Sequence, residues 1–189
     1  MTGGRQIFAP SVPGGYEWAQ SLDVRDHWQI LDRSGLVGAE WRPIPMYLLT
    51  RDDHGRPVRR ADLPWNSGAV IVLRDEAIEV VGDVLRGHGE ILPLECWTAR
   101  LALFSPPLVS GVLDEDRSDL LRFDSGRIMM LKRPAFDLSK LGGIKAFRLA
   151  QMPRNQMYLT QSLVEELLAT GMTSGTEFVP VDFIDSETT

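Results

Sequence analysis

The sequence has few of the residues with which proteins build disulfides, metal sites and membrane spans. Its 189 residues include one cysteine and three histidines. Cys96 cannot form an internal disulfide, and its apolar surroundings predict a small buried thiol in a reducing compartment. No apolar run approaches the roughly 18 residues of a membrane-spanning helix, and residues 1–5 lack the apolar core of a signal peptide. We therefore expect a cytoplasmic protein.

Signatures of catalytic and cofactor sites are also missing. His27, His54 and His88 lie far apart in the chain, whereas a zinc site needs several convergent ligands. The G-x-G sequence at residues 87–89 follows an expected helix instead of opening one, which is the reverse of a dinucleotide-binding fingerprint. No G-x-S-x-G, G-x-x-x-x-G-K-[ST] or H-E-x-x-H motif occurs. We expect no metal, no cofactor and no enzymatic activity.

Besides a binding protein, two other classes of protein remain possible. The chain contains neighbouring carboxylates, such as Asp114 with Asp116 and Glu165 with Glu166, but acid–base chemistry needs a pocket that separates their pKa values. The alternative to a binding protein is therefore a small intracellular enzyme with a carboxylate site that has no sequence signature. A plain adaptor or structural protein is the third possibility.

Composition and charge are those of a folded acidic domain. Hydrophobic residues make up 43% of the chain and charged residues 24%, and the formal net charge is −6. This charge would repel nucleic-acid phosphates and anionic membranes but attract a basic protein, although it also serves to keep a protein soluble. We expect no direct contact with nucleic acid or membranes. The sequence does not indicate an oligomeric state.

The only basic patch lies in residues 51–64, which are also rich in turn-forming residues. We interpret this segment as an exposed loop, because no aromatic residues are interleaved with its charges as single-stranded nucleic-acid binding requires. Its basic residues are Arg51, Arg56, Arg59 and Arg60.

Residues 114–136 are expected to form a β-hairpin around which the chain is organised. The turn is Asp124-Ser125-Gly126, whose glycine tolerates positive φ. Because apolar residues occupy consecutive positions in both arms, we expect other elements to cover both faces of the hairpin. The hairpin should therefore be central. The apolar residues are Leu120, Leu121 and Phe123 in one arm and Ile128, Met129, Met130 and Leu131 in the other.

Periodicity predicts the α+β class, with a mostly antiparallel sheet and two to three packed helices. Helices are expected near residues 22–35, over 75–86 and from 160 or 162 to 171. Strands are expected at residues 46–49, 69–73, 90–96, 100–104, 145–149, 157–159 and 176–181, besides the hairpin. Residues 1–15 are rich in glycine and proline and predict a loose N-terminal segment, in which Ile7 and Phe8 are the only plausible strand. Residues 16–183 should form one domain, and the acidic tail at 184–189 should fray.

Two segments of the chain echo each other. Residues 70–95 and 157–182 align without gaps, with Glu79 opposite Glu166, Glu90 opposite Glu177 and similar apolar positions. The shared unit would be strand, helix, glycine-bearing turn, strand. A third, partial copy places residues 40–44 opposite residues 90–94. Chance is the rival explanation, because all strand–helix–strand segments share apolar periodicity.

A series of short segments resembles a known family in order and spacing. The series contains G-E-I-L-P-L at residues 89–94, L-A-L-F at 101–104 and L-D-E-D-R-S at 113–118, followed by residues 143–149, 157–160 and 171–181. In this series the chain resembles the bacterial immunity-protein family of polymorphic toxin systems, first catalogued as a domain of unknown function. The resemblance covers residues 16–183. It departs from the family at residues 105–107, S-P-P where Asn-Val is common, and at residues 172–175, which have one residue more than Leu-Thr-Gly.

The resemblance implies a cytoplasmic immunity protein that binds and neutralises a cognate toxin, often encoded beside it and plausibly a nuclease. An acidic inhibitor can cover the basic surface that a nuclease presents to phosphates, with fast and salt-sensitive association. We expect the contact at the acidic residues beside the hairpin, with one face of the second expected helix as the other candidate. The two sets are Asp114, Glu115, Asp116 and Asp119, and Glu76, Glu79 and Asp83.

Overall fold

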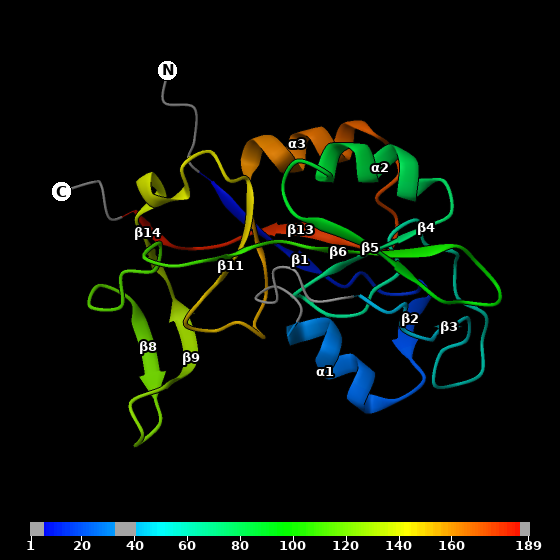
Figure 1. Ribbon diagram of the computed structural model, residues 1–189, viewed down its shortest axis with the longest axis horizontal. Coiled ribbons are helices and arrows are strands. Elements are labelled where there is room, and N and C mark those ends of the chain that lie inside the picture. Colours follow the sequence, from blue (N-terminus) through cyan, green and yellow to red (C-terminus); the bar gives the residue numbers. More distant parts are fainter. Residues whose placement is uncertain (1–5, 33–40, 186–189) are drawn as a thin grey trace.

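The computed structural model describes residues 6–32 and 41–185, and it confirms the α+β class. The described residues form three α-helices and several small sheets, whose strand pairs are mostly antiparallel (Figure 1). Predictions that fall on residues 1–5, 33–40 and 186–189 lie outside the described residues. These include the glycines at 3 and 4, the expected helix stop at Gly35 and most of the acidic tail.

The first half of the echo forms a compact strand–helix–strand unit. β4 (Ile71–Arg74), α2 (Ala77–Leu85) and β5 (Glu90–Leu94) follow one another, and β6 (Leu101–Ser105) lies between β4 and β5, antiparallel to both. Ala77, Val81 and Leu85 recur every fourth residue and therefore share one buried face of α2. The predicted helix and strands of this region are confirmed within one to two residues at each end.

The second half of the echo has the same arrangement. β12 (Tyr158–Thr160), α3 (Gln161–Ala169) and β13 (Glu177–Pro180) follow one another, and β1 (Ile7–Ser11) lies between β12 and β13. β11 (Ala146–Leu149) and β7 (Leu108–Val109) extend this sheet to five strands in the order β13-β1-β12-β11-β7. The prediction of a loose start is thus wrong for residues 7–11, because β1 satisfies its backbone between two strands and buries Ile7.

The two units differ by one position, and the third copy is wrong. Phe104 pairs with Ile71 and Ile91, whereas Phe8 pairs with Leu159 and Pro180, one position further apart. The ungapped alignment is therefore out of register in its last strand.

In the region of the third copy, strand, helix and strand also follow one another, as β2 (Trp18–Ser21), α1 (Val24–Asp32) and β3 (Met46–Leu49). However, β2 pairs directly with β3 and no strand lies between them.

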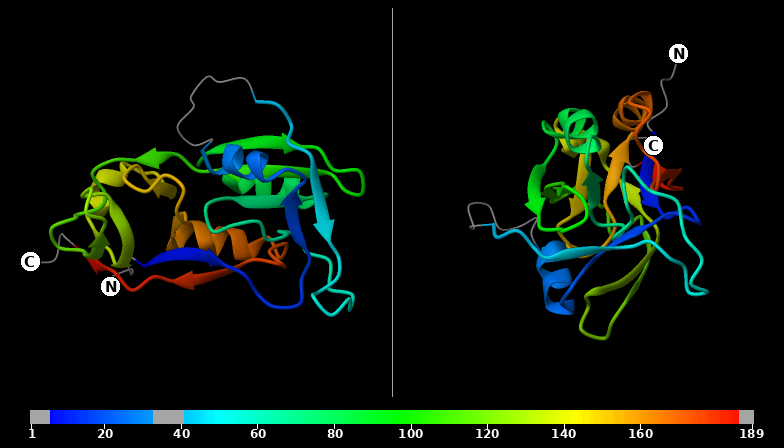
Figure 2. Two further views of the ribbon diagram at one scale, coloured as in Figure 1. Left: turned by 90° about the horizontal axis from the view of Figure 1, so that it is seen from below. Right: turned by 90° about the vertical axis from the view of Figure 1, so that its right-hand side faces the viewer.

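The helices cover the two faces of the sheets. α2 and α3 lie side by side on one face, where their apolar residues share a core with β4, β6 and β12 (Figure 2). α1 and the β2–β3 pair cover the opposite face of the three-stranded sheet and build a second core. All five residues of β6 are buried, because layers pack on both of its faces. The central element of the structure is therefore β6 and not the hairpin that the sequence predicted.

The predicted hairpin exists but is not central. β8 (Asp119–Arg122) pairs with β9 (Ile128–Arg133) around a turn in which Gly126 has φ 80°. The two strands form a separate two-stranded sheet that protrudes at one end of the molecule (Figure 1). Most of their residues are exposed. The prediction of two covered faces is wrong because only one side packs, with Ile128 and Leu131 against the core.

The remaining elements close this end of the molecule. β10 (Ala135–Phe136) pairs in parallel with β14 (Ile184–Asp185), and the short 3₁₀-helix η2 (Leu138–Leu141) follows β10. The expectation of a frayed tail is wrong for residues 184 and 185, since they pair with β10. A third core lies beneath the base of the hairpin and contains a group of three aromatic rings. Phe136 packs edge to face on both Phe147 and Tyr158, and the last two rings are stacked.

Candidate functional site

The exposed part of the β8–β9 hairpin is the candidate site, and we call it the hairpin surface. Leu121 lies directly opposite Met130 in the antiparallel register, so the two side chains stand next to each other. The guanidinium of Arg127 lies 5.9 Å from the centre of the Phe123 ring. The apolar residues of the surface are between 38% and 51% exposed, and they are Leu121, Phe123, Met129 and Met130.

Of the predicted site residues, Asp114 holds the loop before the hairpin. Its Oδ1 accepts the backbone N–H of Arg117 at 3.2 Å, and its carbonyl accepts both the N–H and the hydroxyl of Ser118. The Ser118 Oγ in turn accepts the N–H of Ala135 at 2.8 Å, which ties the loop to β10. Asp114 is half-buried and serves the local fold.

The other three residues of this set differ in how much charge they present. Glu115 forms an ion pair with Arg122, with 2.6 Å between Oε2 and Nη2. Asp116 and Asp119 are exposed and have no ion pair or hydrogen bond from their side chains among the described residues. Residues 114–133 contain five acidic and five basic side chains, so the region is less acidic than residues 114–119 alone indicate. The carboxylates without an ion pair or hydrogen bond among the described residues are Asp116, Asp119 and, in the hairpin turn, Asp124.

The second predicted set lies on α2 and is largely neutralised. Glu79 pairs with both terminal nitrogens of Arg100 at 2.7 and 3.1 Å, and these hydrogen bonds lower the pKa of Glu79. Asp83 pairs with Arg86 at 3.1 Å, one turn along the helix. Glu76 is exposed at the N-cap and its side chain makes no capping hydrogen bond.

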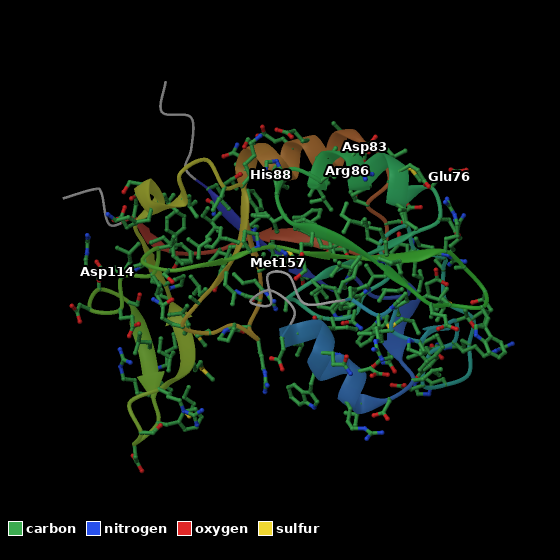
Figure 3. All side chains as sticks on the ribbon, viewed as in Figure 1. Glu76, Asp83, Arg86, His88, Asp114 and Met157 are labelled. Carbon is green, nitrogen blue, oxygen red and sulfur yellow. The ribbon has the colours of Figure 1, made fainter. Side chains whose placement is uncertain are left out.

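The structure does not bring the two predicted sets together. In Figure 3, Glu76 and Asp83 lie at the end of the molecule opposite Asp114. One compact interface therefore includes one set or the other. The hairpin set adjoins exposed apolar side chains on a protruding element, whereas the α2 set lies on a helix whose carboxylates pair mainly with arginines. The hairpin surface is the better candidate on both counts.

A network of charges around Asp75 was missed by sequence reasoning. Burial by itself would raise the pKa of the Asp75 carboxyl. Hydrogen bonds from the Arg100 backbone and from Arg60 and Arg74 have a larger, opposite effect, so the pKa lies below its ordinary value. Arg74 also pairs with the buried Glu17, which accepts the N–H of Ala61 at 3.0 Å. Apart from the adjacent Arg74 and Asp75, these groups are far apart in sequence, so the network has no local sequence signal. The network connects β4, the residue before β6 and residues 60–61. Because each of its carboxylates is paired with an arginine, we interpret the network as part of the fold and not as a binding site.

The basic segment is largely exposed over residues 51–60, as predicted, but the prediction is wrong for Ala61, Leu63 and Pro64, which are buried. Aromatic side chains from other segments contact the exposed part. Arg59 lies over the Tyr16 ring at 3.9 Å, and Tyr16 and Trp18 line an open groove beside Arg51 and Arg56. Residues 51–64 themselves contain no Phe, Trp or Tyr, and the two aromatic side chains come from residues 16 and 18. Asp52 pairs with Arg56 and Asp75 with Arg60, so the loop carries little uncompensated positive charge.

Several features of the described residues bear on enzymatic activity. They contain no group of three or more His, Cys, Asp or Glu placed to hold a metal ion. The pKa values of Asp23, Asp52, Asp75 and Glu79 are all lowered by donors, whereas a carboxylic acid that donates a proton near neutral pH needs a raised pKa. Cys96 is partly exposed in the loop after β5, with Sγ 3.5 Å from the Thr98 hydroxyl, and is not the buried thiol expected. Nowhere in residues 6–32 and 41–185 is a helix long and apolar enough to cross a membrane.

Comparison with known proteins adds no relative to this picture. No protein-family model matches the chain, and no curated protein matches its sequence.

Proposed function

We propose that this protein is a cytoplasmic immunity protein that binds and neutralises a cognate bacterial toxin, and that the hairpin surface makes the contact. The proposal joins the resemblance in residues 16–183 with one observation, the exposed apolar side chains on a protruding two-stranded sheet. Exposed apolar patches that are rimmed by polar residues are typical of binding surfaces. The partner would be a toxin with a basic surface, for which a nuclease is the expected example.

The chemistry of the hairpin surface supports protein binding. Methionine and phenylalanine are enriched at protein interfaces, and methionine adapts its shape to a partner. Charged residues, among them Asp116, Asp119, Arg127 and Lys132, surround the apolar side chains. This is the arrangement of an interface with an apolar centre and a charged rim. The free aspartates would steer a basic partner, while burial of the apolar side chains would hold it.

The enzyme with a carboxylate site remains the alternative, and no observation among the described residues favours it. Its carboxylates with shifted pKa values are held ionised by arginines and backbone donors. A measured turnover that disappears when a single carboxylate is neutralised, with folding intact, would favour the enzyme over the binding protein.

The direct test expresses the neighbouring open reading frame with and without this protein. We expect the neighbour to be toxic alone, harmless with this protein and recovered with it as a stable complex. A neighbour that is harmless alone, or that kills despite this protein, would refute the proposal.

The location of the contact is tested by charge removal on two faces. In the purified complex, Asp116→Asn with Asp119→Asn should weaken toxin binding at low salt and have little effect at high salt, because salt screens exposed charges. The matched control is Glu76→Gln with Asp83→Asn on α2, which should leave binding unchanged. If the control weakens binding and the hairpin variant does not, the interface lies on α2.

A further inference from the structure

We propose that the toxin contributes an extended segment that pairs with the outer edge of β8. The two strands of the hairpin and the toxin segment would then form one three-stranded sheet. This inference rests on the proposed function and specifies how the hairpin surface is used. It follows from three features of β8: its unpaired backbone, its lack of protection by proline and the charge along its edge.

The first feature is the unpaired backbone of β8. Within the described residues β8 pairs only with β9, so one side of its backbone has no strand partner. Alternate N–H and C=O groups of a strand point to its two sides, and an unpaired edge is a template for another extended chain. In Figure 1, β9 lies between β8 and the body of the molecule, so that β8 is the outer strand of the hairpin. The open edge is therefore that of β8.

The second feature separates β8 from other sheet edges of this protein. The edge strands β5 and β13 contain Pro93 and Pro180, whose nitrogens cannot donate a hydrogen bond. The edge strand β7 is only two residues long and follows two prolines. β8 and β9 contain no proline, and β8 also carries the exposed Leu121. Of these edges, β8 is the one open to an added strand.

The third feature indicates the chemistry of the incoming segment. Arg122 is neutralised by Glu115, whereas Asp119 at the beginning of β8 has no partner for its carboxylate among the described residues. A complementary strand would carry Lys or Arg beside Asp119 and an apolar side chain beside Leu121, since neighbouring side chains of paired strands contact each other. A second copy of this chain is a poor occupant, because two molecules of net charge −6 repel. A basic toxin is a good one.

The test uses the complex with the neighbouring toxin, and it measures the backbone directly. Strand addition predicts that, among residues 119–122, the alternate amides whose N–H groups face the open edge exchange at least tenfold more slowly when the toxin binds, whereas those that face β9 change less. Contact through side chains alone would leave these amides unchanged. A stable complex in which they exchange as fast as in the free protein would overturn the inference and leave the proposed function standing. Absence of any complex would refute both.

Two substitutions test the side chains. Leu121→Lys should weaken binding more than tenfold at both roughly 0.05 M and roughly 0.5 M salt, whereas Asp119→Lys should do so mainly at the lower concentration. Glu76→Lys makes the same charge change on α2, at the opposite end of the molecule, and Leu168→Lys replaces an exposed leucine of α3 by lysine. Both controls should bind within threefold of the wild type. Thermal unfolding of each free variant identifies one that fails to fold, and the exchange measurement on the wild-type complex decides the inference in that case.

Discussion

Replacement of the buried Arg148 by methionine should make the protein more stable. Arg148 lies in β11, and its side chain is fully buried. One guanidinium nitrogen, Nη1, donates to the carbonyl of Leu31 at the end of α1, at 2.9 Å. The other two, Nε and Nη2, are buried and have no hydrogen-bond partner among residues 6–32 and 41–185. Desolvation lowers the pKa of Arg148 to about 10, yet the group stays charged at neutral pH.

The magnitude follows from two opposing contributions. A pKa of about 10 in place of 12.5 corresponds to about 3 kcal/mol against the charged form in the folded protein. Loss of the charged hydrogen bond to Leu31 costs about 2 kcal/mol. Methionine keeps most of the side-chain volume, so little cavity forms. We therefore expect Arg148→Met to raise the free energy of unfolding by about 1 kcal/mol, in the direction found when buried ionic groups are replaced by apolar ones.

Urea denaturation followed by tryptophan fluorescence measures this change, provided that the slope m is unchanged. Arg148→Ala is the matched control. It removes the same charge but leaves a cavity, and it should lower stability by about 2 kcal/mol relative to Arg148→Met. Because the pKa is lowered on folding, the unfolded chain holds the proton more tightly, so wild-type stability gains from rising pH above about 10. The advantage of Arg148→Met should shrink there. If Arg148→Met is less stable than the wild type by 2 kcal/mol or more at neutral pH, the reasoning is refuted.

Two further changes test the backbone and the charge network. Asp75→Asn keeps the positive φ of 50°, which asparagine tolerates, but removes the charge that pairs with Arg60 and Arg74 and that accepts the backbone N–H of Arg100, so it should cost about 2 kcal/mol. Because the pKa of Asp75 is lowered on folding, its stabilisation is present above about pH 4 and is lost below it; an acid titration of Asp75→Asn that matches the wild type would contradict this. Gly175→Ala should cost about 3 kcal/mol in the same assay, since φ is 92° and the added Cβ would lie 2.7 Å from the Leu63 carbonyl oxygen. Gly87→Ala, with nothing within 4 Å, should be neutral.

The helices and most strands were predictable because their signals are local. The apolar residues of α2 and α3 recur at helical spacing, and Gly171, with φ 70°, stops the last helix where the sequence analysis expected it. The strand–helix–strand echo also has a structural counterpart, since β4-α2-β5 and β12-α3-β13 share one topology. The intervening strand was not predictable in the second unit, because β1 comes from the far end of the chain.

The candidate site shows where local signals stop. Consecutive apolar residues in β8 and β9 favoured a buried hairpin, and the same pattern in β6 marks a strand that is buried on both faces. Composition does not distinguish the two, because burial depends on which other elements pack nearby. Likewise Asp116 and Glu115 are both acidic in the sequence, but only the fold brings Arg122 within 2.6 Å of Glu115.

Sequence alone was sufficient for the α+β class, the hairpin with its glycine turn and the three helices, since backbone preferences and apolar periodicity act over a few residues. The protruding position of the hairpin, the open edge of β8 and the pairing of each carboxylate were decided only by the tertiary structure. They depend on contacts between residues far apart in the chain, such as β1 with β12 and Arg148 with Leu31. Such contacts form when packing brings segments together, and no local pattern records them.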